Sequence, residues 1–229
     1  MAADLDESPN EVVVAAPEAG FWRVGRTPNP LAFPPSSEPI SAGSGNRWDS
    51  AAGEFSVLYL GTTLEVCFGE TLARVRPKLP VLKIVQEEWR DLGFMDIGGL
   101  PADWRTRRQA ARAEPLEADL PFLNVDSPEA VELIRHDLCD EIVELGYEDI
   151  DLSHIQGQDR QLTRLISAWA HHEGFGGIRY VSRLDHQWEC WALFEGNPIR
   201  QVEVRPISKE MPELVKVARR YGLTVHGTH

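Results

Sequence analysis

The segment from Phe55 to Leu60 is apolar at every position except Ser56, and Gly61 follows it. Both faces of an extended chain would be apolar here, which is typical of a strand in the centre of a sheet. The residues that follow change to helical spacing and predict a helix with its own buried stripe. The positions that share this stripe are Leu64, Cys67, Phe68, Leu72 and Val75.

Thr62 and Glu65 have the spacing of a capping box and predict the start of this helix. Glu70 falls on the flank of the helix, because each residue advances the side-chain direction by about 100°. A carboxylate on such a flank can face a cleft beside the sheet. Taken alone, Glu70 has the simpler interpretation of a solvated surface glutamate.

The remaining pattern predicts further strands and helices. Ser127 and Asp159 stand where helix caps are expected, and Gly196-Asn197 has the composition of a hairpin turn between the last two strands. This irregular order predicts an α/β (α+β) fold: a single compact domain with a mixed β-sheet flanked by helices. The predicted strands are 21–24, 79–85, 177–182, 189–195 and 199–207, and the predicted helices are 103–113, 127–145, 160–172 and 208–221.

We expect residues 1–20, rich in Ala, Asp, Glu and Pro, to form a flexible N-terminal segment. The catalytic or binding domain would then occupy residues 21–229. Between 25 and 45 the chain contains five prolines, and this length suggests a binding loop rather than a simple connection.

The formal net charge of −13 argues against direct binding to nucleic acid, which requires a basic face. Cys67, Cys139 and Cys190 are distant from one another, so neither a disulfide framework nor a zinc site is expected. Reduced, buried thiols and a cytoplasmic location fit this pattern. We see no signal peptide and no apolar run long enough to span a membrane.

Common cofactor and metal motifs are missing from the sequence. No GxGxxG follows a strand, and neither GxxxxGK[ST] nor HExxH occurs. His171-His172-Glu173 is a weak metal candidate, because adjacent helical histidines point about 100° apart. Cys67 and Cys190 stand at core-like positions, which favours inert thiols over a catalytic cysteine.

A different set of residues stands near the ends of predicted strands and helices: Arg23, Arg47, Tyr59, Glu70 and Ser182. Each has a structural alternative. The arginines could form surface ion pairs, the tyrosine could be a core aromatic, and the serine could belong to a turn. Arginines also bind phosphate oxygens in a bidentate manner, and a carboxylate stabilises an oxocarbenium-like transition state.

Short pieces of sequence in a characteristic order carry a resemblance to a known family. They are FWRV (21–24), RWD (47–49), VLYLG (57–61), GETLARVR (69–76), LPADW (100–104) and GIRYVSR…WECWALFEG (177–196). With these pieces the chain resembles the RES domain family over most of its folded part.

The resemblance implies a fold similar to the ADP-ribosyltransferase toxins and cleavage of NAD at its nicotinamide–ribose bond. NAD is then a substrate, and no cofactor or metal is implied. Catalysis would fall to Glu70, Arg47 and Ser182, and NAD binding to Arg23, Arg47, Tyr59 and Ser182. Arg26 is close enough to Arg23 to be an alternative first arginine.

The resemblance also implies a toxin of a toxin–antitoxin system, with an Xre-type helix-turn-helix antitoxin as partner and water, phosphate or a protein as acceptor. Two alternatives stay open: a mono-ADP-ribosyltransferase acting on a protein target, and a non-catalytic interaction module that retains the fold. The acidic region 114–158 departs from the family pattern and is interpreted as an insertion or a partner surface.

Overall fold

The computed structural model of the chain describes residues 12–35, 39–41, 44–88, 98–116 and 120–226. The chain forms two compact units that alternate along the sequence. The first unit comprises Met1–Glu18, Phe33–Tyr59 and Pro115–Ile199, and the second comprises Ala19–Ala32, Leu60–Glu114 and Arg200–His229. Strand β3 (Val57–Gly61) begins in the first unit and ends in the second.

The sheet of the first unit has the strand order β1-β6-β7-β8-β3. Strand β6 runs parallel to β7, whereas β7 and β8 form an antiparallel hairpin and β1 is antiparallel to β6. The prediction of a strand at residues 177–182 is confirmed. The bounds are β1 Val13–Val14, β6 Phe122–Asn124, β7 Gly177–Ser182 and β8 Asp185–Phe194.

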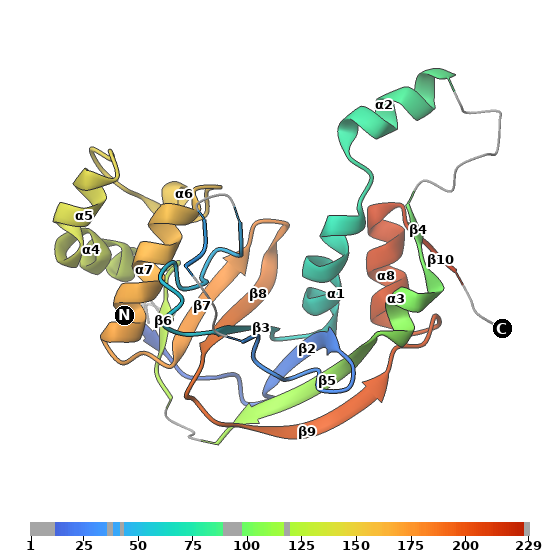
Figure 1. The fold of residues 1–229 in the computed structure, drawn as a ribbon, viewed down its shortest axis with the longest axis horizontal. Helices are drawn as coiled ribbons and strands as arrows, with labels where there is room; N and C mark the ends of the chain where they lie inside the picture. The colour runs from blue at the N-terminus through green and yellow to red at the C-terminus, as the bar shows by residue number, and fades with distance from the viewer. Residues whose placement is uncertain (1–11, 36–38, 42–43, 89–97, 117–119, 227–229) are drawn as a thin grey trace, which may run out of the picture. The chain divides into compact units, whose positions relative to one another are not determined.

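Helix α7 packs against β7 and closes the core of the first unit (Figure 1). It starts after the predicted cap, since Asp159 accepts a hydrogen bond from the Gln161 N–H at 2.8 Å. Ser127 likewise caps α4, as expected, but the predicted helix 127–145 is interrupted at Leu138 and forms two helices. The helices of this unit are α4 Pro128–Asp137, α5 Cys139–Glu144, α6 Leu152–Ile155 and α7 Arg160–His172.

The second unit contains the strand order β3-β2-β5-β9 and a short parallel pair, β10-β4. The prediction of a helix at 103–113 is wrong: a short helix, α3, ends at Thr106, and strand β5 begins at Arg108. Alanine favours helices by itself, but pairing with β2 buries the alanines of β5 and overrides this preference. The bounds are β2 Phe21–Arg26, β4 Gly99–Leu100, β5 Arg108–Pro115, β9 Ile199–Pro206, β10 Thr224–Val225 and α3 Ala102–Thr106.

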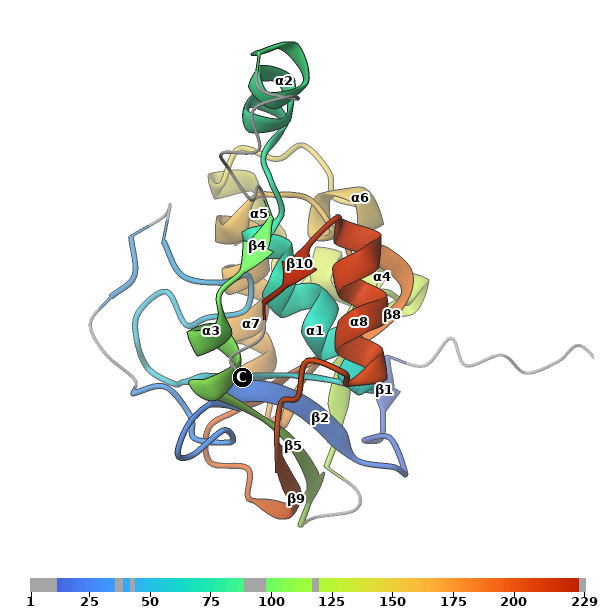
Figure 2. The ribbon, with the colours of Figure 1, turned by 90° about the vertical axis from the view of Figure 1, so that its right-hand side faces the viewer.

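Helices α1 and α8 lie side by side in the second unit (Figure 2), and the Tyr221 hydroxyl of α8 donates to the Gly69 carbonyl of α1 at 3.3 Å. The cap of α1 is Thr63, not Thr62, because the Thr63 hydroxyl accepts from the Val66 N–H. The predicted strand 79–85 is instead part of helix α2. The bounds are α1 Leu64–Leu72, the 3₁₀ helix η1 Ala73–Val75, α2 Leu79–Glu88 and α8 Pro212–Tyr221.

Two further expectations need correction. Gly196-Asn197 does not join a hairpin, because β9 pairs with β5 whereas β8 lies between β7 and β3. The last helix begins at Pro212 rather than at Ser208, since proline is well suited to a first helical position. Of the expected flexible segment 1–20, residues 1–11 lie outside the described part, and Val13–Val14 form β1.

The predicted class, a mixed sheet flanked by helices, is confirmed by the parallel and antiparallel pairs and the helices packed beside them. In the described ranges no helix is both long and apolar enough to cross a membrane. Nor do three or more His, Cys, Asp or Glu side chains of these ranges gather into a group that could hold a metal ion.

We expect Asp159→Ala to lower the free energy of unfolding by about 1 kcal/mol, because α7 loses its N-terminal cap. Asp159 also accepts from the Tyr147 hydroxyl at 2.6 Å, and this hydrogen bond raises the pKa of Tyr147 to about 12. The pKa of Tyr147 should therefore fall in the variant, as measured by ultraviolet titration. Asp159→Asn, which retains a capping oxygen, is the matched control in urea denaturation.

Candidate functional site

The guanidinium group of Arg47 is held in the first unit by a hydrogen bond and by contacts with two aromatic rings. Its Nη2 donates to the Ile155 carbonyl, at the end of α6, at 2.6 Å. The guanidinium carbon lies 5.0 Å from the ring centre of Trp48 and 5.3 Å from that of Tyr180. Such cation–π contacts hold a planar cation in a defined orientation. Arg47 is half-buried, so its position is set before any ligand arrives.

The turn that carries Arg47 is closed by the hydroxyl of Tyr59. This hydroxyl accepts from the Trp48 N–H at 3.0 Å and donates to Asp49 Oδ1 at 2.7 Å. Asp49 Oδ2 in turn accepts from the Asn46 N–H at 2.5 Å. Burial and the Asp49 carboxylate hold the pKa of Tyr59 well above its usual value, although Arg47 acts in the opposite direction. Tyr59 is therefore a neutral phenol that fastens the turn, and it cannot act as a general base near neutral pH.

Helix α7 holds the segment that precedes and includes this turn. Arg164 is only 3% exposed, yet its partners are backbone carbonyls rather than a carboxylate. Arg160 and Ser167 lie on the same face of α7, and each donates to one carbonyl, at 2.7 Å in both cases. The carbonyls bound by these side chains belong to Ser41, Ser44 and Asn46 (Arg164), Gly45 (Arg160) and Trp48 (Ser167).

Ser182 is the last residue of β7 and is buried, with 5% of its surface exposed. Its Oγ accepts from the Leu184 N–H at 3.0 Å, so it shapes the hairpin to β8. The interpretation of Ser182 as a turn residue is therefore confirmed, because its Oγ accepts a hydrogen bond within the turn between β7 and β8. Ser182 belongs to the same unit as Arg47 and Tyr59.

In the second unit, the charges of a cation and a carboxylate act on the buried thiol of Cys67. Burial raises the pKa of Cys67 to about 12; the Arg23 guanidinium opposes this shift and the Glu70 carboxylate adds to it. Cys67 Sγ donates to the Trp22 carbonyl at 3.0 Å, which ties α1 to β2. Burial also lowers the pKa of Arg23. Arg23 of β2 and Glu70 of α1 are thus both near Cys67, and Glu70 itself is exposed.

The predicted residues fall into two groups. Arg47, Tyr59 and Ser182 belong to the first unit, and Arg23 and Glu70 belong to the second. Between the two candidates for the first arginine, the contrast is clear: Arg26 is exposed at the end of β2, whereas Arg23 is half-buried beside Cys67.

Sequence reasoning missed the residues that support the site. Asp49 stands in the RWD piece and Tyr180 in GIRYVS, but the sequence alone predicts no role in the site for either residue. Arg164 shows a signal that could have been noticed, since an arginine beside the core stripe of a helix is rarely buried without partners. The inert-thiol interpretation of Cys67 agrees with its raised pKa, but Cys139, expected to be buried, is exposed.

Comparison with models of known protein families identifies the class of protein to which this fold and these side chains belong. The chain belongs to the RES domain family, whose model matches residues 21–213. All five candidate residues lie within this range. No sequence among curated proteins shows significant similarity to the chain.

A solved structure shares the fold. It is a chain in the crystal structure of the M. tuberculosis MbcT–MbcA toxin–antitoxin complex, with a TM-score of 0.53 and 10% sequence identity. The similarity covers 92% of this chain and 89% of that chain. At this identity the likeness establishes the fold.

We expect Arg164→Leu to lower the free energy of unfolding by about 1–3 kcal/mol, because several carbonyls lose their buried donor. The segment 41–48 should also become more sensitive to limited proteolysis. Arg160→Leu, which removes the exposed hydrogen bond to the Gly45 carbonyl from the same helix face, is the matched control and should cost less than Arg164→Leu. Equal losses in the two variants would contradict the role given to Arg164.

The three cysteines should differ sharply in reactivity. Because the thiolate is the reactive form, a pKa of about 12 leaves Cys67 almost fully protonated at pH 8. We expect iodoacetamide to modify the exposed Cys139 in the folded protein, and the buried Cys67 and Cys190 only after denaturation. Peptide mass spectrometry measures this directly. Early modification of Cys67 would show that the thiol is more accessible than its burial implies.

Proposed function

We propose that this protein is the toxin of a toxin–antitoxin pair and that it cleaves NAD at the bond between nicotinamide and ribose. Membership of the RES domain family supports the toxin assignment, and the structural neighbour comes from a toxin–antitoxin complex. We propose a helix-turn-helix protein of the Xre type as antitoxin. The partner of this toxin, not the toxin itself, would contact DNA.

The observation that supports the proposed reaction is that the charges of Arg23 and Glu70 both act on the thiol of Cys67. The exposed Glu70 carboxylate on α1 and the half-buried Arg23 guanidinium on β2 thus act on the same thiol. The positively charged nicotinamide leaves without needing an acid, so the main requirement is to stabilise the oxocarbenium-like ribose. Glu70 would supply that negative charge and orient the acceptor.

Arg47 is our candidate for binding phosphate oxygens of NAD, and Arg23 is a second candidate for the same role. Guanidinium groups form paired hydrogen bonds with phosphate oxygens, and the contacts of Arg47 with Trp48, Tyr180 and Ile155 fix its orientation in advance. Ser182 would donate its hydroxyl proton to the ribose or the carboxamide. The ring of Tyr59 remains our candidate for stacking on nicotinamide, while its hydroxyl stabilises the turn.

The proposal predicts that purified protein releases nicotinamide from NAD and that Glu70→Gln lowers this rate at least about 100-fold, because the transition state loses its counter-charge. Glu65→Gln is the matched control, since Glu65 lies on the same helix and pairs with Lys216 at 2.7 Å. This control should retain activity. Unchanged folding of both variants is checked by circular dichroism.

The products identify the acceptor. With NAD alone, free ADP-ribose indicates water, and a phosphorylated product that forms only when phosphate is added indicates phosphorolysis. Labelling of a protein from labelled NAD instead indicates a mono-ADP-ribosyltransferase. Absence of nicotinamide release under all of these conditions would leave only a non-catalytic module with this fold. In cells, expression should deplete NAD and arrest growth, and Glu70→Gln should relieve both effects.

A further inference from the structure

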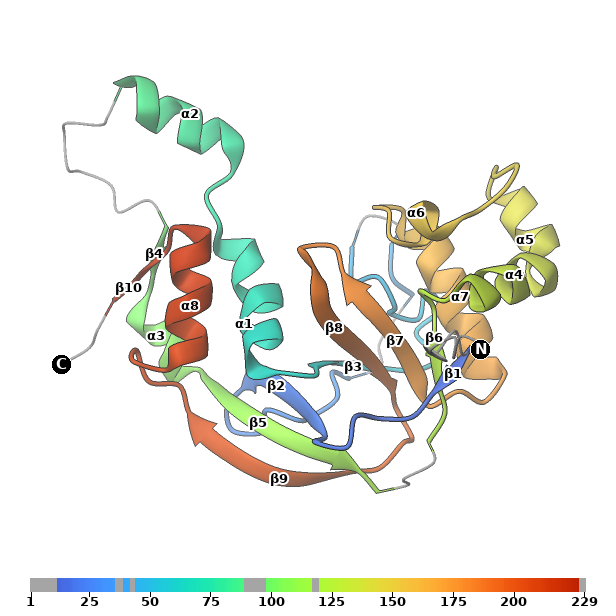
Figure 3. The ribbon, with the colours of Figure 1, turned by 180° about the vertical axis from the view of Figure 1, so that it is seen from behind.

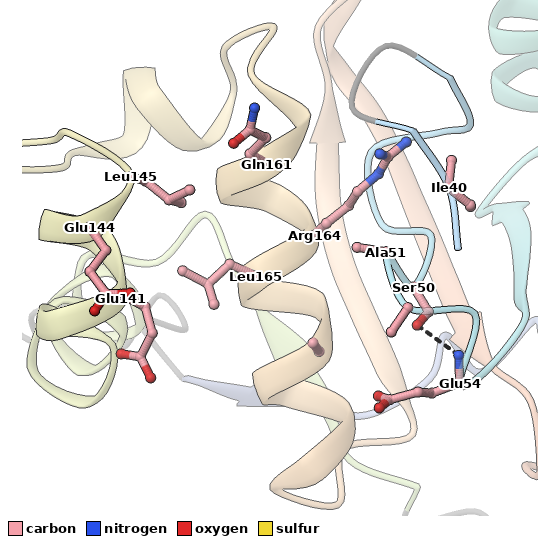
Figure 4. A pocket seen from close by; sticks show the side chains of 12 residues that line it. Ile40, Ser50, Ala51, Glu54, Glu141, Glu144, Leu145, Gln161, Arg164 and Leu165 are labelled. Atoms are coloured by element: carbon pink, nitrogen blue, oxygen red, sulfur yellow. Dashed lines mark hydrogen bonds between the residues drawn. The ribbon is translucent and has the colours of Figure 1, made fainter. Parts of the chain in front are cut away.

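A groove on the first unit is lined by none of the residues proposed to bind NAD. It has a volume of about 540 Å³ and is lined by α5, α7 and residues 50–54 (Figure 4). Leu145, Leu165, Ala51 and Ala168 make its surface largely apolar. A concave apolar surface of this size is within the range in which proteins bind ligands or side chains of a partner. We refer to it as the α5–α7 groove.

The charges around this groove are all negative apart from Arg164, whose guanidinium is occupied by carbonyls. Glu141 and Glu144 project from α5, and Glu54 lies on the opposite side of α7 (Figure 4). Among the residues that the structure describes, none of these three glutamates has an ion-pair partner. The groove therefore suits an occupant that presents cations on both sides of apolar side chains.

Helix α2 of the second unit has a surface with this character. It stands clear of α1 and α8 (Figure 3), and Leu79 and Leu82 are 80% and 37% exposed. At about 100° per residue these two leucines are neighbours on one face, with Lys78 on one side and Lys83 on the other. Both lysines are exposed. Exposed leucines on a helix face indicate a surface that becomes covered by a partner.

We propose that α2 of one copy docks into the α5–α7 groove of a second copy of this chain. Leu79 and Leu82 lie on the apolar floor beside Leu145 and Leu165, and the two flanking lysines pair with the glutamates on the rim. A helix laid in an apolar groove is a common mode of recognition. The two surfaces differ, so the interface is heterologous, and each copy offers one helix and one groove. This association is independent of the proposed reaction.

Sedimentation velocity of the full chain over a concentration series tests the proposal. The wild-type protein should show a mass above that of one chain as concentration rises. Two double charge reversals, Lys78→Glu with Lys83→Glu and Glu141→Lys with Glu144→Lys, should each raise the dissociation constant at least about tenfold, because like charges then face each other. All four positions are exposed, so the fold should tolerate these changes.

The decisive measurement is a mixture of the two variants. In this mixture the acidic α2 of the lysine-reversal variant meets the basic groove of the glutamate-reversal variant. The unchanged, basic α2 of the glutamate-reversal variant meets the unchanged, acidic groove of the lysine-reversal variant. An equimolar mixture should therefore associate although neither variant does so alone. Glu129→Lys with Glu148→Lys, which changes the net charge equally at exposed positions outside the groove, should leave wild-type association intact.

Three results would overturn the proposal. The wild-type chain could stay monomeric at all concentrations, in which case α2 and the groove serve a different protein. Association could survive both charge reversals, which would place the interface elsewhere. A mixture that remains monomeric would show that the reversals act separately and that α2 does not meet the groove.

Discussion

The orientation of Arg47 depends on hydrogen bonds that helix α7 donates to the backbone of the segment before it. The described residues of this segment belong to no strand, so their carbonyls need other donors. One face of α7 supplies them through Arg160, Arg164 and Ser167. The buried side chain of Arg164 thereby ties the described residues of this irregular segment to α7. The stability of α7 and the geometry of the site are therefore linked.

In the second unit, the candidate side chains are positioned by a regular strand and a regular helix. Arg23 is fixed by strand β2 and Glu70 by helix α1, and the thiol of Cys67 connects these two elements through the Trp22 carbonyl. Because the thiol is buried and neutral, it adds no charge that would compete with the arginine or the glutamate. A chain with a net charge of −13 can thus present local positive charge where an anionic ligand would bind.

Prediction from the sequence succeeded where local signals agreed. Asp159 and the apolar stripe behind it defined α7, and the β-branched and apolar residues of GIRYVS defined β7. It failed where a short segment had no strong preference of its own. Residues 108–115 became a strand through pairing with β2, and residues 79–85, an apolar run that equally suits a strand, became part of helix α2.

The sequence by itself determined the family and the five candidate residues, because short motifs in a fixed order can be recognised without knowing which residues are in contact. The tertiary structure decided which side chains support them. The rings of Trp48 and Tyr180 beside Arg47, and the position of Cys67 near both Arg23 and Glu70, arise from packing between segments far apart in the chain. Local patterns carry no information about such contacts, since these depend on how whole elements pack.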